Sequence, residues 1–247
     1  MSEDLNWKVE QACFNAWPAP RQLVLDGWAL RSSGGPTRRA NSANPLHAGA
    51  EMSETLIDRV EAFYRRQGKP AMFRIPDMAG EIDQMLEARG YMLDAPTRTL
   101  FGSLEGFDQD RDAMIAPTPS DVWLAARDRL SRANPEAAAA YRAIIDVILL
   151  PSGFAAVAED GAIMSLAFGV LQDELLIVES VMTDPDARQR GFARQCLSGL
   201  FGWARGQGAR SVALQVMADN DPAVALYGKL GLSRHLYDYH YRIRREP

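Results

Sequence analysis

The segment ARQRGFARQCL, residues 187–197, combines residue types that can bind a phosphate group. Arginines precede Gly191, and an amphipathic helical pattern follows it. The first turn of a helix presents N–H groups without partners and a partial positive charge, and a glycine admits a ligand close to the backbone. Between Ala187 and Ala218 there is no acid, whereas arginines occur at 188, 190, 194, 205 and 210. These residues predict a pyrophosphate site, and a plain strand–helix turn with solvated arginines is the alternative.

The position of this turn favours ligand binding. It follows a predicted strand, LLIVESVMT, and open α/β sheets bind ligands at the carboxyl ends of their strands. The chain contains neither G-x-x-x-x-G-K-[ST] nor G-x-G-x-x-G, which excludes the two common nucleotide loops. The spacing that does occur is [Q/R]-x-x-G-x-[G/A], from Arg188 through Gly191 to Ala193.

A second motif, NDPAVALYGKLGL at 220–232, follows after one predicted helix and one predicted strand. It matches N-x-x-A-x-x-L-Y-x-x-x-G-[FL] at Asn220, Ala223, Leu226, Tyr227 and Gly231. In this order and spacing, the two motifs resemble those of the GNAT superfamily of acyl-CoA-dependent N-acetyltransferases, over roughly residues 115–247. The resemblance implies acetyl-CoA as co-substrate, no metal, and a small-molecule or peptide amine as acceptor.

The resemblance also implies which residues hold the coenzyme. In the superfamily the first motif cradles the pyrophosphate of coenzyme A. The strand before it offers backbone groups to the pantetheine and the thioester. The coenzyme-binding residues expected here are Val181, Thr183, Arg188, Gln189, Arg190, Gly191, Phe192, Ala193, Arg194 and Asn220.

Two residues are expected to move protons. Tyr227 matches the superfamily tyrosine near the coenzyme sulfur, where it could protonate the leaving thiolate; packing of its ring against the sheet is the alternative. The amine must also lose a proton to a base. Glu179, two residues before Val181, is the expected base, since burial would raise the pKa of its carboxyl. A water relay and three other side chains stay open, namely Glu174, Asp184 and His240.

Alternating patterns place both motifs in an α/β fold. In the second half we predict helices over 120–132 and 134–149, three strands within 154–183, a helix over 191–208 and a strand over 210–217. A helix capped by Asp221 and one or two final strands follow. In the first half we predict strands within 21–35, 37–46, 71–76 and 91–104, and helices over 53–68 and 77–90. The resemblance implies a mixed, mostly antiparallel twisted sheet flanked by helices.

The two halves end in the same order of strand, helix, strand, helix and strand. QMLEARGY aligns with ALYGKLGL when Gly90 is set on Gly231, which puts Leu86 in the place of Tyr227. We therefore expect two tandem GNAT-like domains that meet near the Pro- and Asp-rich stretch 103–121: a degenerate domain at 1–105 and a catalytic domain at 106–247. The first has ANPLHAGAEM where a phosphate loop would stand and would wall the acceptor cleft. The alternative to duplication is the alternation of strands and helices that α/β proteins have in common.

Composition excludes several other classes. The 247 residues carry a net charge of −5, which argues against a nucleic-acid partner. Cys13 and Cys196 show no metal spacing, and neither do the three histidines. No run approaches the ~20 apolar residues of a membrane span, so we expect a cytoplasmic protein without a membrane partner. A homodimer stays open, as do two competing functions: a non-catalytic acyl-CoA-binding module and an α/β nucleotide-binding enzyme.

Overall fold

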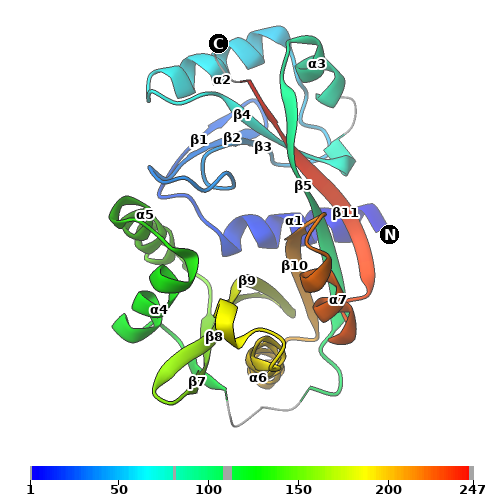
Figure 1. Cartoon of the computed structure of the whole chain (residues 1–247). Helices are drawn as coiled ribbons and strands as arrows, with labels where there is room; N and C mark the ends of the chain where they lie inside the picture. Colours follow the sequence, from blue (N-terminus) through cyan, green and yellow to red (C-terminus); the bar gives the residue numbers. More distant parts are fainter. Residues whose placement is uncertain (1, 80–81, 108–112, 245–247) are drawn as a thin grey trace.

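A computed structural model describes residues 2–79, 82–107 and 113–244, and their strands form one mixed sheet (Figure 1). The strands are β1 (Arg21–Leu25), β2 (Trp28–Ser32), β3 (Ala43–Pro45), β4 (Met72–Pro76), β5 (Met92–Ser103), β6 (Met114–Ala116), β7 (Ser152–Glu159), β8 (Ala162–Gln172), β9 (Leu175–Thr183), β10 (Ser211–Met217) and β11 (Arg234–Ile243). Their order is β1-β2-β3-β4-β11-β5-β10-β9-β8-β7-β6. Only β3–β4 and β9–β10 pair in parallel among the described strands, which confirms the predicted mostly antiparallel sheet.

The helices are α1 (Ser2–Ala16), α2 (Glu54–Arg65), α3 (Ile82–Ala88), α4 (Asp121–Ser131), α5 (Pro135–Ile145), α6 (Phe192–Gly206) and α7 (Asp221–Lys229), with short 3-10 turns at Asp77–Ala79 and Pro185–Ala187. Most of the predicted helices begin at the capping residues that we expect. Ser53 caps α2, and Asn134 with the following proline caps α5. The cap of α7 is Asn220 and not Asp221, because the Asn220 side chain accepts from the Ala223 N–H, so the prediction was wrong by one residue.

The last strand of each half lies beside strands of the other half. β10 pairs along its whole length with residues 97–103 of β5, β11 pairs with β4, and β5 and β11 pair with each other at the centre. Outward from this central pair, both sides continue with an antiparallel, then a parallel, then an antiparallel neighbour. The sheet therefore runs across the predicted boundary at 105/106 and is built as two similar halves that exchange their final strands.

The helix ends before β5 and β11 are also built alike. Gly90 and Gly231 both adopt a left-handed conformation, with φ of 80° and 86°. The N–H of the next residue donates to the carbonyl of Leu86 in one half and of Tyr227 in the other, at 3.0 Å in both. The residues that align in sequence thus make the same closing turn, which accounts for the glycine at each position.

Helix α1 lies between the two halves, where it packs against β8 and β9 of the second half and bonds to Arg31 and Arg74 of the first (Figure 1). Its buried face, which includes Val9, Ala12, Cys13 and Ala16, joins a core with Phe168 of β8 and tyrosines of β11. We did not predict this helix, although its apolar residues recur at the spacing of three and four that a helix requires. α4 and α5 share this core, α6 and α7 form a second core on the sheet, and α2 and α3 form a third over β2–β4.

Part of the predicted linker lies outside the described residues, at 108–112. The segment after it, Met114–Ala116, pairs with β7 as the short edge strand β6, which the composition of the linker did not indicate. Residues 234–243 form one strand, β11, with two irregularities in its register with β5.

Candidate functional site

Strands β9 and β10 run in parallel and then separate, which leaves an opening at their carboxyl ends. Their pairing covers residues 175–178 of β9 and 211–214 of β10. Just beyond it, β9 has a bulge, since Ser180 has a φ of 53° and the register with β8 shifts there. Bulges redirect a strand and occur often beside functional sites. Val181 and Thr183 lie half-buried on the part of β9 that extends beyond its pairing with β10, where the resemblance expects the thioester.

The N-terminus of α6 follows β9 and is open to a ligand. Gly191 begins the helix at a φ of 88°, and no side chain caps it. A Cβ built on Gly191 would meet no atom within 4 Å. Gln189, before it, also has a positive φ, of 62°. The first N–H groups of the helix therefore face open space with the positive end of the helix dipole, which is the arrangement expected for a pyrophosphate.

The arginines around the start of α6 differ in whether they have an ion-pair partner. Arg188 and Arg194 are exposed and have no ion-pair partner among the described residues. Arg190 instead pairs with Glu159 at 2.7 Å, and its guanidinium lies 4.9 Å from the ring centre of Phe192. Two of the three predicted arginines thus have charge free for a ligand, and the third is held by the β7–β8 hairpin.

Tyr227 lies on α7, which follows β10 as α6 follows β9. The side chain is buried, with 7% of its surface exposed. Burial, reinforced by the negative charge of Glu179, raises the pKa of Tyr227 to about 12, so the phenol is protonated at neutral pH. Its hydroxyl has no hydrogen-bond partner within the described part of the chain. The proton of Tyr227 is therefore available to a substrate atom.

Glu179 is buried as expected, at 5% exposed, but its carboxylate is not isolated. Both oxygens accept from Arg39 at 2.6 Å. Arg39 comes from the loop between β2 and β3, and its guanidinium lies 4.6 Å from the ring centre of Trp17. Burial opposes the charge on Arg39, but the pairing with Glu179 outweighs it and raises the pKa of Arg39. The expected base is thus one half of a buried ion pair between the two halves of the chain.

The other side chains considered as bases are engaged elsewhere. Glu174 pairs with Arg210 at 2.8 Å, and Asp184 pairs with Arg129 at the end of α4. His240 lies 2.7 Å from Asp83, on the part of β11 that pairs with β4. Each of the three carboxyl or imidazole groups is therefore held by a partner side chain.

Two further predicted residues have structural roles. The amide oxygen of Asn220 holds the first turn of α7, at 3.3 Å from the Ala223 nitrogen. Cys196 is fully buried on α6, where burial raises the pKa of its thiol to about 12, so core packing is confirmed for this residue. Neither position offers a reactive group to the opening.

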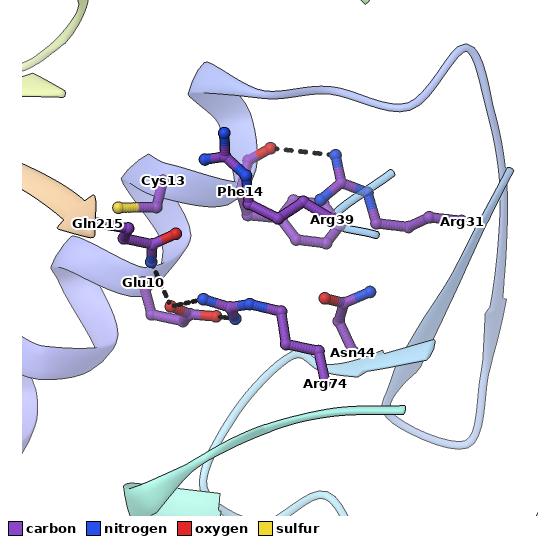
Figure 2. A pocket seen from close by; sticks show the side chains of 8 residues that line it. All are labelled: Glu10, Cys13, Phe14, Arg31, Arg39, Asn44, Arg74 and Gln215. Atoms are coloured by element: carbon purple, nitrogen blue, oxygen red, sulfur yellow. Dashed lines mark hydrogen bonds and ion pairs between the residues drawn. The ribbon is translucent and has the colours of Figure 1, made fainter. Parts of the chain in front are cut away.

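A small polar chamber lies behind Arg39 (Figure 2). Its free volume of about 10 Å³ is at the limit of what one water molecule requires. Arg74 pairs with Glu10 of α1, and Arg31 donates to the carbonyls of Phe14 and Trp17. The lining residues are Glu10, Cys13, Phe14, Arg31, Arg39, Asn44, Arg74 and Gln215. No sequence pattern indicates this cluster, because its members lie far apart in the chain.

On the other side of Arg39 and Gln215 a cleft of about 290 Å³ opens between the two halves. The 36–39 loop forms one wall, and β5, β10 and β11 form the other. Its lining residues are Pro36, Thr37, Arg38, Arg39, Ala95, Thr97, Gln215, Met217, Tyr239 and Tyr241. Since Gln215 and Met217 belong to the end of β10 that has separated from β9, the cleft lies next to the opening described above.

The corresponding helix start in the first half is closed to an anion. The Ser53 hydroxyl accepts from the Leu56 N–H at 3.1 Å, so the first turn of α2 is capped. Glu51 lies in the loop before it and Glu54 begins the helix. A capped first turn with two nearby carboxylates lacks the free donors and positive field of the α6 start.

The described residues contain neither a candidate metal site nor a candidate membrane span. Across residues 2–79, 82–107 and 113–244, no group of three or more His, Cys, Asp or Glu side chains is arranged to hold a metal ion. Within the same residues, no helix combines the length and apolar character needed to cross a bilayer.

Comparison with known proteins agrees with this geometry. Residues 7–242 match the model of a family described as "Probable histone acetyltransferase Rv0428c C-terminal". The chain is 28% identical to "Uncharacterized N-acetyltransferase YobR" of Bacillus subtilis over 96% of this chain and 98% of that protein. It is 26% identical to "Probable histone acetyltransferase Rv0428c" of Mycobacterium tuberculosis over 81% of this chain, and it spans 62% of that protein.

Among solved structures, a GCN5-related N-acetyltransferase from Kribbella flavida superimposes with a TM-score of 0.70 at 13% identity, over 98% of this chain and 96% of that one. This likeness shows the fold, and the family match extends over nearly the whole chain. The chain belongs to the family described as "Probable histone acetyltransferase Rv0428c C-terminal", and with it to the GNAT superfamily of acetyl-CoA-dependent N-acetyltransferases.

Proposed function

We propose that the chain transfers an acetyl group from acetyl-CoA to a primary amine by direct attack in a ternary complex. The observation that carries the proposal is the open, uncapped start of α6 at the carboxyl ends of β9 and β10, with the free hydroxyl of Tyr227 on the neighbouring helix α7. Arg188 and Arg194 would place positive charge beside the pyrophosphate. The edge of β9 that β10 leaves free beyond Val178, at Val181 and Thr183, would meet the pantetheine and thioester.

The reaction in this proposal balances without a further reagent. The lone pair of the neutral amine attacks the thioester carbon, a C–N bond forms, and the C–S bond breaks when the tetrahedral intermediate collapses. The ammonium form of the acceptor loses one proton before the attack and a second one after it. One proton goes to the coenzyme sulfur and the other to solvent, so the products are the N-acetylated amine and CoA thiol.

Tyr227 would act on the leaving sulfur. With its pKa raised to about 12, complete proton transfer to a thiolate, whose conjugate acid has a pKa of about 8.5, is uphill by roughly 5 kcal/mol. We therefore assign to Tyr227 a hydrogen bond that stabilises the charge developing on sulfur, with full protonation as the coenzyme leaves. The group is suited to this because burial keeps its proton in place at neutral pH.

We keep Glu179 as the proposed base, provided that its ion pair with Arg39 opens during the reaction. Both of its oxygens accept from Arg39, so Arg39 must shift before the carboxylate can take a proton from the acceptor. A water relay is the alternative, and it would leave the pair intact. The route through Glu179 therefore requires Arg39 to move, whereas the water relay does not.

We propose that residues 1–105 form the degenerate half, which walls the acceptor cleft and binds no coenzyme, and that residues 106–247 hold the catalytic site. The capped start of α2 and its nearby carboxylates support this assignment. The 36–39 loop, which lines the cleft and supplies Arg39, is what the first half would contribute.

Thermal-shift measurements with CoA, ATP and NAD, followed by thiol release from acetyl-CoA with a panel of amines, test the proposal. We expect CoA to stabilise the full chain, and at least one amine to accelerate thiol release. Stabilisation by ATP or NAD but not by CoA would overturn the coenzyme assignment. CoA binding without turnover on any amine would favour the non-catalytic binding module.

A further inference from the structure

We infer that the acceptor amine also carries an anionic group, a carboxylate or a phosphate, which Arg39 binds. The inference rests on the proposed function and names its substrate class. It comes from the charges that face the 290 Å³ cleft between the two halves, where an acceptor would have to lie to reach the end of β9. A cleft of this size suits a small metabolite, at the lower end of the range of ligand pockets.

The lining of the cleft contains two arginines and no carboxylate. Among its ten lining residues, Arg38 and Arg39 carry charge and the remainder are neutral. Asp94 pairs with Arg38 at 2.7 Å and offsets that arginine at the rim. Arg39 is therefore the cation that an acceptor meets inside the cleft, although an enzyme for simple ammonium compounds would be expected to present a carboxylate.

Arg39 lies between the cleft and Glu179. Arg39 lines both the cleft and the chamber behind it, whereas Glu179 lines neither and is 5% exposed. An acceptor with only a positive charge would approach Glu179 against the charge of Arg39. An acceptor with an anionic group gives Arg39 a second partner of the planar, bidentate kind that guanidinium groups prefer.

The chamber adds a buried positive charge behind Arg39. Arg31 is 2% exposed and donates only to backbone carbonyls within the described residues, so no carboxylate is paired with it, although the charge of Glu179, which is already paired with Arg39, also acts on it. The Nε atoms of Arg31 and Arg74 are also buried without a partner in the described part of the chain. Glu10 and Glu179 offset Arg74 and Arg39, which leaves this region with one uncompensated cation. The field inside the cleft therefore favours an anion.

A zwitterionic acceptor can replace the ion pair without leaving a buried charge alone. Its anionic group takes the place of Glu179 on Arg39, and its ammonium group takes the place of Arg39 on Glu179. Two new ion pairs form in place of the one that opens. Neither Arg39 nor Glu179 is then left as an unpaired buried charge, which would be strongly destabilising. The exchange would also free Glu179 to accept the proton of the ammonium group, which is the condition that its role as base requires.

The test compares matched acceptors on the wild-type full chain. Initial rates of thiol release from acetyl-CoA are measured for lysine against 1,5-diaminopentane, 4-aminobutyrate against butylamine, and phosphoethanolamine against ethanolamine, with spermidine and a lysine-rich peptide as polycations. We expect kcat/KM for the anionic member to exceed that of its partner at least ~10-fold in one or more pairs. Comparison of the lysine pair with the phosphoethanolamine pair shows whether the cleft prefers a carboxylate or a phosphate on the acceptor. Equal or better use of the bare amines or polycations overturns the inference.

Calorimetric titration of the CoA-bound protein with the same pairs separates this inference from the proposed function. If no amine is acetylated, the proposed function fails, but tighter binding of the anionic members still supports the selectivity of the cleft, and equal binding overturns it. Arg39→Gln, and Arg39→Gln combined with Glu179→Gln so that no buried charge is left alone, should bring the preference ratio close to one. CoA affinity reports folding of each variant. Arg59→Gln, in an exposed pair with Asp26, is the matched control and should keep the ratio.

Discussion

Replacing Gly191 with glutamate places a negative charge where the pyrophosphate of the coenzyme is proposed to lie. Gly191 begins α6 at a φ of 88°, and a Cβ there would meet no protein atom within 4 Å. The side chain would therefore enter the space in front of the helix without displacing the protein. Two effects are expected, one from backbone strain and one from charge, and a second substitution separates them.

The size of each effect follows from the geometry. An L-residue in the left-handed region costs about 1–2 kcal/mol, which lowers the melting temperature by a few degrees in a chain of this length. A carboxylate at roughly 6 Å from one phosphate charge, with an effective dielectric constant of about 20, repels it by about 3 kcal/mol. This repulsion corresponds to a Kd for CoA that is roughly 100-fold higher. Gly191→Ala shares the strain and lacks the charge, so its Kd should rise less than ~10-fold.

Calorimetry with CoA on the two Gly191 variants and the wild type measures these values. Gly68→Glu is the matched control, because Gly68 also has a positive φ, of 67°, and open space around a built Cβ, but follows α2 in the other half. We expect Gly68→Glu to lower the melting temperature and to leave CoA affinity unchanged. Wild-type affinity in Gly191→Glu, or an equal loss in the Gly68 control, would refute the placement of the pyrophosphate at α6.

Three other predictions follow from the same geometry. Tyr227→Phe should lower turnover by at least ~10²-fold and change CoA affinity little; equal turnover at every pH would remove Tyr227 from the mechanism. Hydrogen bonds from Arg242, with a smaller contribution from His240, lower the pKa of Asp83 to about 2, so these bonds stabilise the fold above the ordinary carboxyl pKa near 4 and lose their effect as the pH falls toward 2. Asp83→Asn should therefore lower the melting temperature at pH 7, by an amount that shrinks between pH 4 and 2, and a pH-independent difference would contradict this. Residues 106–247 alone should not unfold cooperatively, because β10 and β11 lose their common neighbour β5; co-expression with 1–105 should restore cooperative unfolding, and a stable isolated fragment would count against the strand exchange.

Local features of the site could be predicted because they depend on neighbouring residues. The left-handed start of α6 needs the glycine at 191, and the sharp end of α7 needs the glycine at 231. The caps at Ser53 and Asn134 follow from side chains that bond the helix they precede. Such short-range rules fix where helices begin and end, and they placed the α6 start at the carboxyl end of β9.

The long-range features could not be predicted from the same patterns. β11 alternates aromatic and polar residues whereas β5 has no regular period, and neither pattern determines which strands they lie between. The exchange of these strands depends on the packing of the complete sheet. In the same way, the pairing of Arg39 with Glu179 joins positions 140 residues apart, so spacing along the chain carries no information about it. Glu179 was expected to be buried, and burial is confirmed, but its partner was missed.

Intact-mass measurement of the enzyme and its products after reaction with acetyl-CoA tests the central claim of direct transfer most directly. The enzyme is incubated with acetyl-CoA alone and then with a panel of amines. Since Cys13 and Cys196 are both buried free thiols, we predict that the enzyme mass stays unchanged without an amine, and that an N-acetylated amine forms together with CoA thiol. Absence of an acetylated product from every amine, or an acetylated enzyme that passes its acetyl group to the amine, would contradict the account.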